Sequence, residues 1–92
     1  MRYINNIGPQ VRRLRNARGW SQSIFTAKLQ ILGLEISRSS LSKIEARLNY
    51  VDDTTMLYLA EALKVPIQDL FPQKQAGNRL REFLEKLNQT RF

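Results

Sequence analysis

A short run of hydroxyl and basic side chains between residues 37 and 43 has the composition of a hydrogen-bonding surface. Helical spacing places Arg38, Ser39, Ser42 and Lys43 on one face of a helix that is expected to begin at Ser37. Arg and Lys donate to the O6 and N7 atoms of guanine in the DNA major groove, and the short serines keep the helix slim enough to enter it. The opposite face is apolar and consists of Leu41, Ile44 and Leu48. These residues predict a DNA-reading helix, although the same charges are also compatible with an ordinary solvated helix face.

The positive charge of the chain is concentrated in the half that contains this run. The 92 residues carry a formal net charge of +7. Residues 1–50 contain nine basic and two acidic side chains, whereas residues 51–92 contain six of each. Such asymmetry indicates a first half that faces a polyanion and a second half that does not.

Composition argues against an enzyme and against a metal protein. The chain has no His and no Cys, so imidazole bases, thiolate nucleophiles and the common zinc and iron ligands are missing. No Gly-rich loop precedes a Lys at the spacing of a P-loop. We therefore expect no catalytic residues, no cofactor and no small-molecule substrate.

Nothing in the sequence directs the chain to a membrane. No apolar run approaches the roughly 20 residues that a membrane-spanning helix needs. The first residues, Met1 to Asn6, contain no apolar signal-peptide core. The expected location is therefore the cytoplasm.

The spacing of apolar residues predicts an all-α protein, and no segment alternates as a strand would. A first helix contains Ile7, Val11 and Leu14; Asn5 or Asn6 is its candidate cap. Ser21, Ser37 and Asp52 are good N-caps for three further helices, and each stands between apolar residues placed to form a staple. Gly33 ends the helix that begins after Ser21, and Pro66 follows the helix that begins after Asp52. Residues 67–71 then predict a short fifth helix.

The chain divides into a domain over residues 1–72 and a linker with a C-terminal amphipathic helix over residues 73–92. Four apolar residues of that last helix share one face: Leu80, Phe83, Leu84 and Leu87. A single helix of about 12 residues is marginally stable in water and has to pack on something. It either folds back on its own domain or pairs with the same helix of a second subunit, and we favour the dimer.

Three separate blocks resemble the phage-repressor and Cro type of helix-turn-helix protein, the XRE family. The blocks occur in the family's order and span about residues 7–71; they are Ile7–Leu14-Arg15 to Gly19-Trp20-Ser21-Gln22, then Ile36-Ser37-Arg38-Ser39-Ser40-Leu41-Ser42-Lys43-Ile44-Glu45, then Leu59-Ala60-Glu61-Ala62-Leu63-Lys64-Val65 to Leu70-Phe71. The resemblance implies a compact five-helix DNA-binding domain. It also implies a transcriptional regulator, most simply a repressor, that binds double-stranded DNA as a homodimer.

The resemblance also assigns roles to individual positions. Arg38, Ser39 and Lys43 match base-reading positions of the recognition helix, with Ser42 on the same exposed face. Gln22 matches a position that contacts phosphate and sometimes an outer base. The resemblance places Ser37 and Ser40 near phosphate or the helix cap. By position alone, Arg47 and Asn49, where the chain leaves the recognition helix, are candidate phosphate contacts. Arg12 and Arg13 on the first helix are either phosphate contacts or ordinary helix surface.

Arg15 and Glu45 match a partly buried ion pair of the family, which ties the first helix to the end of the third. This assignment is structural rather than DNA-binding. It predicts that one of the nine basic groups in the first half is used internally.

Three positions depart from the family pattern. Residues 30–35 lengthen the connection before the recognition helix by about five residues, so we expect the second helix to gain one turn and an extended Leu34-Glu35 stretch to follow. Thr26 replaces the small Ala that the family prefers. The segment after Glu45, from Ala46 to Asn49, lacks the frequent Gly, and this predicts a longer recognition helix.

Two other functions fit parts of the sequence. A protein-interaction or antitoxin-like module on the same fold, without sequence-specific DNA reading, is favoured by the long connection and the apolar C-terminal helix. A small basic RNA-binding protein would need exposed aromatics for base stacking. Only Tyr3, Tyr50 and Tyr58 are candidates for that role, because Trp20, Phe25 and Phe71 are expected in the core.

Overall fold

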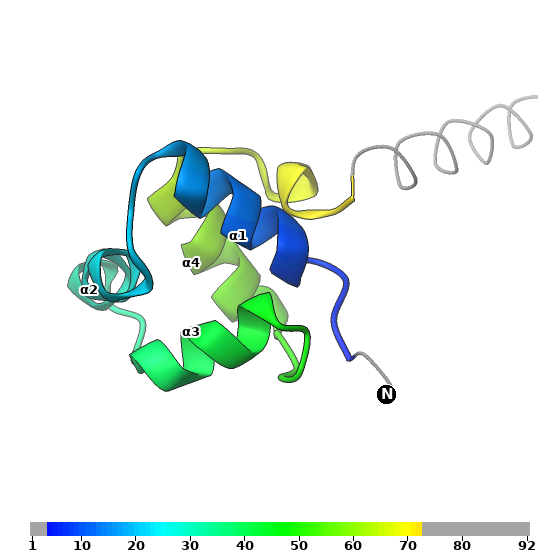
Figure 1. Ribbon diagram of the computed structural model, residues 1–92, viewed down its shortest axis with the longest axis horizontal. Coiled ribbons are helices and arrows are strands. Elements are labelled where there is room, and N and C mark those ends of the chain that lie inside the picture. Colours follow the sequence, from blue (N-terminus) through cyan, green and yellow to red (C-terminus); the bar gives the residue numbers. More distant parts are fainter. Residues whose placement is uncertain (1–3, 73–92) are drawn as a thin grey trace, which may run out of the picture.

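The computed structural model describes residues 4–72, which fold into four α-helices and one 3₁₀ helix with no strand among them (Figure 1). The expected all-α class and the helix-turn-helix arrangement are confirmed for this region. The predicted C-terminal helix with Leu80, Phe83, Leu84 and Leu87 lies outside the described residues. The elements are α1 (Gly8–Ala17), α2 (Gln22–Leu32), α3 (Arg38–Glu45), α4 (Asp53–Leu63) and η1 (Ile67–Leu70).

Side-chain caps set the starts of three helices. The side chains of Ser21, Ser37 and Asp52 accept hydrogen bonds from the backbone N–H groups of Ile24, Ser40 and Thr55. Each cap thereby satisfies a backbone donor that the helix cannot satisfy itself. The bonds from Thr55 also hold the pKa of the Asp52 carboxyl below its ordinary value, because they stabilise the ionised form.

The start of α1 uses a different device. Its N-cap, Ile7, makes no side-chain cap bond. Instead the Oδ1 atom of Asn5 accepts from the N–H groups of Ile7 and Gly8 at 3.1 and 2.9 Å. The Nδ2 atom of Asn5 donates to the carbonyls of Ile44 and Asn49 at 3.1 and 2.9 Å. One nearly buried side chain thus ties the start of α1 to the end of α3.

The core lies between the four α-helices and η1: α3 packs on α1 and α2, and α4 packs on α2 and η1 (Figure 1). Phe25, Leu29, Leu41, Leu59 and Leu63 are fully buried. Trp20 packs beside Phe25 with ring centroids 5.8 Å apart, as the staple spacing predicted. Burial of these side chains is the main stabilising term of so small a domain, and it fixes the face that α3 leaves outside.

The connection between α2 and α3 follows the expectation for the lengthened segment. Helix α2 continues to Leu32, and Gly33 then adopts a left-handed conformation with a φ of 111°. Residues 34–37 form no helix or strand and lead to the Ser37 cap. The Nε2 atom of Gln30 donates to the carbonyl of Ile36 at 2.8 Å and holds this stretch against the end of α2.

Two sequence expectations about helix ends were wrong in detail. Helix α3 does not continue past Glu45: Ala46 is its C-cap, and Arg47 takes a left-handed conformation with a φ of 65° at the place where the family often has Gly. The short fifth helix expected over residues 67–71 is a 3₁₀ helix, Ile67–Leu70, which ends one residue earlier with Phe71 as its C-cap. Tertiary contacts, rather than a Gly signal, terminate α3.

None of the helices in the described part of the chain combines the length and the apolar character that crossing a membrane requires.

Candidate nucleic-acid interface

Helix α3 presents a continuous polar face to solvent. Arg38, Ser39, Ser42 and Lys43 are all exposed. Leu41 and Ile44, on the other face, are buried at 0% and 4% exposure and anchor the helix. An eight-residue helix held by one apolar face thus offers guanidinium, ammonium and hydroxyl donors, the groups that read base edges in a major groove.

The two serines at the start of α3 are engaged with each other. The Oγ atom of Ser37 accepts from the Ser40 backbone N–H at 3.0 Å and donates to the Ser40 hydroxyl at 3.1 Å. Ser37 is exposed and Ser40 is half-buried. Their first role is therefore to cap α3, and any contact with phosphate would be added to that role.

Arg15 and Glu45 form a bidentate ion pair in the interior. The Nε and Nη2 atoms of Arg15 donate to the two carboxylate oxygens of Glu45 at 2.7 and 2.9 Å. The side chains are 10% and 0% exposed, and Arg15 Nη1 also donates to the Trp20 carbonyl at 2.7 Å. The hydrogen bond to Glu45 raises the pKa of the Arg15 guanidinium above its ordinary value, so this guanidinium stays charged at any ordinary pH.

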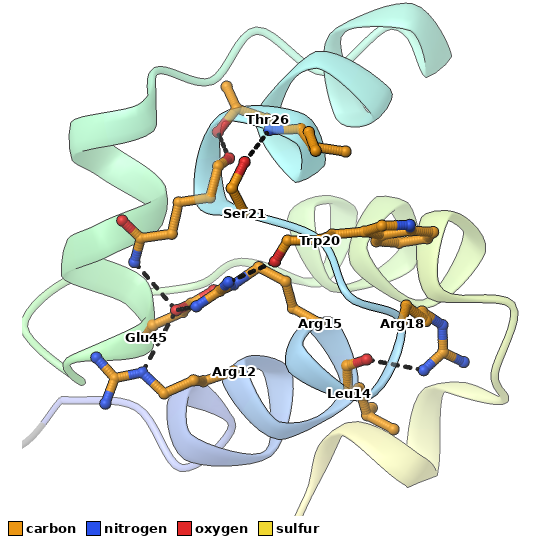
Figure 2. A network of polar contacts seen from close by, with 10 residues as sticks. Arg12, Leu14, Arg15, Arg18, Trp20, Ser21, Thr26 and Glu45 are labelled. Atoms are coloured by element: carbon orange, nitrogen blue, oxygen red, sulfur yellow. Dashed lines mark hydrogen bonds and ion pairs between the residues drawn. The ribbon is translucent and has the colours of Figure 1, made fainter.

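Glu45 has two further partners, which the sequence did not reveal (Figure 2). Gln22 Nε2 donates to Glu45 Oε1 at 3.1 Å, and Arg12 Nε lies 3.6 Å from the same oxygen. Gln22 was predicted as a phosphate contact, and it is half-buried at the start of α2. Arg12 and Arg15 are three residues apart on α1 and therefore lie on the same face of the helix. This spacing was the sequence signal that both side chains can reach one partner.

Arg47 and Asn49 lie just beyond α3, in contact with the segment before α1. Arg47 Nε donates to the Asn5 carbonyl at 2.7 Å, and Arg47 Nη2 donates to the Asn6 side-chain oxygen at 3.1 Å. The Asn49 carbonyl accepts from Asn5. Both predicted flank residues therefore help to attach the N-terminal segment to the end of α3, a structural use that the spacing did not indicate.

Thr26, the departure from the family's small residue, fits beside α3 without an unsatisfied hydroxyl. It is 6% exposed, and its Oγ1 donates to the Gln22 carbonyl one turn earlier at 2.7 Å. The extra polar atom is thus satisfied within α2.

The architecture defines a class of protein: a helix-turn-helix domain in which α2 and α3 are joined by a lengthened turn and α3 exposes basic and hydroxyl side chains. The sequence profile of the helix-turn-helix family matches residues 11–70. The chain therefore belongs to the XRE-type helix-turn-helix family of DNA-binding transcription regulators.

A solved structure of similar fold is the restriction-modification controller protein C.AhdI from Aeromonas hydrophila. It is 29% identical to this chain with a TM-score of 0.63, and the alignment covers 72% of this chain and 92% of that one. No curated protein matches the chain at a significant level.

Proposed function

We propose that this protein is a sequence-specific transcriptional regulator, most simply a repressor, that acts in the cytoplasm and recognises an operator through α3. Arg38, Ser39 and Lys43 read base edges, and Ser42 lies beside them. Gln22 and the loop after α3 contact phosphate. Lys and Arg supply affinity through counterion release, whereas the donors on α3 supply sequence preference.

The observation that carries this proposal is the division of α3 into two faces. All four polar residues of the outer face are exposed, while Leu41, Ile44 and Glu45 are buried. An ordinary solvated helix face would show the same exposed polar residues without binding DNA. Membership of the helix-turn-helix family supports the role of this face in reading DNA bases. The related controller protein supports a regulatory role in the same way.

Selection of bound sites from random duplex DNA is the sharpest test, because it returns sequence, symmetry and half-site spacing together. We expect enrichment of a defined site. A gel shift against duplex DNA, single-stranded DNA and RNA at two salt concentrations is the matching control. Equal binding to all three would contradict sequence-specific reading.

We further propose that the regulator is a homodimer. A symmetric dimer places two recognition helices about 34 Å apart and reads an inverted repeat. The apolar stripe predicted in residues 73–92 supports a second subunit as its partner. Light scattering of the full chain and of a variant without residues 74–92 tests this: a dimer that becomes a monomer supports it, and a monomeric full chain contradicts it.

A protein-interaction module is the second candidate, and exposed apolar side chains favour it. Ile31 is 84% exposed and Leu32 is 42% exposed at the end of the lengthened α2. They directly flank residues of a shallow groove, which is lined by Gln30, Gly33, Leu34, Glu35, Ile36 and Ser37. A full-length protein that shows no preference for duplex DNA would favour this candidate.

A further inference from the structure

The carboxylate of Glu45 is the meeting point of three helices. It belongs to α3 and contacts Arg12 and Arg15 of α1 and Gln22 of α2. A single oxygen, Oε1, receives Arg15 Nη2 at 2.9 Å, Gln22 Nε2 at 3.1 Å and Arg12 Nε at 3.6 Å. A structural ion pair requires only the first of these partners.

The charges are arranged so that the cluster is positive on its outer side. Arg15 offsets the charge of Glu45 in the interior, through two hydrogen bonds. The side chain of Arg12 is 57% exposed, whereas that of Glu45 is fully buried. The remaining positive charge therefore lies at the surface on Arg12, and the carboxylate is shielded from any anion that approaches.

Glu45 also determines which way the two outer groups face. A carboxylate only accepts hydrogen bonds, so the amide of Gln22 turns its nitrogen toward Glu45 and keeps a second hydrogen on that nitrogen for another acceptor. Figure 2 shows the terminal nitrogens of Arg12 on the side away from Glu45. Both inner nitrogens lie within 3.6 Å of the same oxygen, so the Arg12 guanidinium and the Gln22 amide are grouped around one carboxylate.

We propose that Glu45 is a positioning residue that aims the Arg12 guanidinium and the Gln22 amide at the same DNA phosphate. This inference rests on the proposed DNA-binding function and adds a shared target for two side chains from different helices. It gives the buried carboxylate a use in recognition beside its use in stability.

A double-mutant cycle on the full-length protein tests the shared target. Binding of the selected duplex is measured by fluorescence anisotropy for Arg12→Ala, Gln22→Met and the double variant. Each single change weakens binding about tenfold, since each removes one hydrogen-bonding group. If both groups serve one phosphate, the double variant loses about 10- to 20-fold rather than about 100-fold, because residues that act on one partner are not additive.

Arg13 provides the matched control. It is exposed on the same helix, and it makes no contact with Glu45. Combining Arg13→Ala with Gln22→Met should give losses that multiply. The salt dependence gives a second readout: Arg12→Ala lowers the slope of log K against log salt by about one, and Gln22→Met leaves it unchanged.

The carboxylate itself is tested by repeating the cycle in a Glu45→Gln background. There the coupling between Arg12 and Gln22 should fall to that of the Arg13 control; if this background does not fold, the cycle in the natural chain decides. Losses that multiply for Arg12 and Gln22 in the natural chain, with duplex binding intact, overturn this inference alone. A natural chain that does not prefer duplex DNA overturns the proposed function as well.

Discussion

Arg38 is the residue on which base reading should depend most directly. It is exposed in the first turn of α3, and Arg can donate two bonds to one guanine. Arg38→Ala should cost about 1–3 kcal/mol on the preferred site and relax selectivity at one or two base positions. Repeating the site selection with the variant measures this. A uniform loss across all sequences would instead place Arg38 on a phosphate.

Glu45 affects stability before it affects binding. Arg15 is only 8% exposed, so removal of its carboxylate partner leaves a charge buried without compensation. Glu45→Ala should lower the free energy of unfolding by about 3–5 kcal/mol in urea titration. Arg12→Ala removes only an exposed partner at 3.6 Å and should cost under about 1 kcal/mol. A Glu45→Ala protein with unchanged stability would contradict the role assigned to the pair.

At the scale of elements, the close approach of α1 to the end of α3 depends on Gly8. A Cβ atom at that position would lie 2.3 Å from the Ile44 carbonyl oxygen and 2.8 Å from that of Glu45. Both are backbone atoms and cannot move aside cheaply. Gly8→Ala should therefore destabilise the protein by about 1–3 kcal/mol, as overpacking typically does.

Ala17→Gly is the control for Gly8→Ala, because Ala17 ends the same helix and is exposed. It should cost at most about 1 kcal/mol through helix propensity. Chemical denaturation of both variants makes the comparison. A Gly8→Ala change no larger than this control would show that α1 and α3 can separate without penalty.

The end of α4 offers a stabilising change. Lys64 is its C-cap in a left-handed conformation, with φ 60° and ψ 43°, and its side chain is exposed. A side chain with a Cβ pays about 1–2 kcal/mol for this conformation, and Gly does not. Lys64→Gly should raise stability by about 0.5–1 kcal/mol, after the greater freedom of Gly in the unfolded chain is subtracted. An unchanged or lower melting temperature of the Lys64→Gly variant would contradict the backbone strain assigned to Lys64.

The helix starts were predictable because caps are local. Ser21, Ser37 and Asp52 each bond to a backbone group three residues later, so the sequence contains all the information needed. The end of α3 was not predictable in this way. Arg47 accepts a left-handed conformation because its side chain bonds to Asn5 and Asn6, about 40 positions away.

The candidate site shows the same contrast. The exposed face of α3 follows from helical periodicity, and the Arg15–Glu45 pair followed from family resemblance. The convergence of Gln22 and Arg12 on Glu45 depends on how three helices cross, which no local pattern encodes.

At the scale of the whole molecule, the uneven charge of the chain separates into groups with different uses. Arg15 is used internally on Glu45, and Arg18 donates to the carbonyls of Leu14 and Leu63. Lys28 lies over the Trp20 ring at 4.6 Å. The remaining exposed cations of the first half include Arg12, Arg13, Arg38 and Lys43 on α1 and α3. The basic half is therefore a set of placed groups rather than a diffuse positive surface.

This arrangement predicts a steep dependence of DNA binding on salt. If a dimer neutralises about 6–10 phosphates, its affinity should fall about 10³- to 10⁵-fold between about 50 and 200 mM salt. Anisotropy titrations of the full-length protein at several salt concentrations give the slope, and unrelated duplex DNA of equal length is the control. That control should show a similar slope and weaker binding throughout, since phosphate contacts carry no sequence information. A slope near zero on the selected site would mean that the exposed cations of the first half neutralise no phosphates.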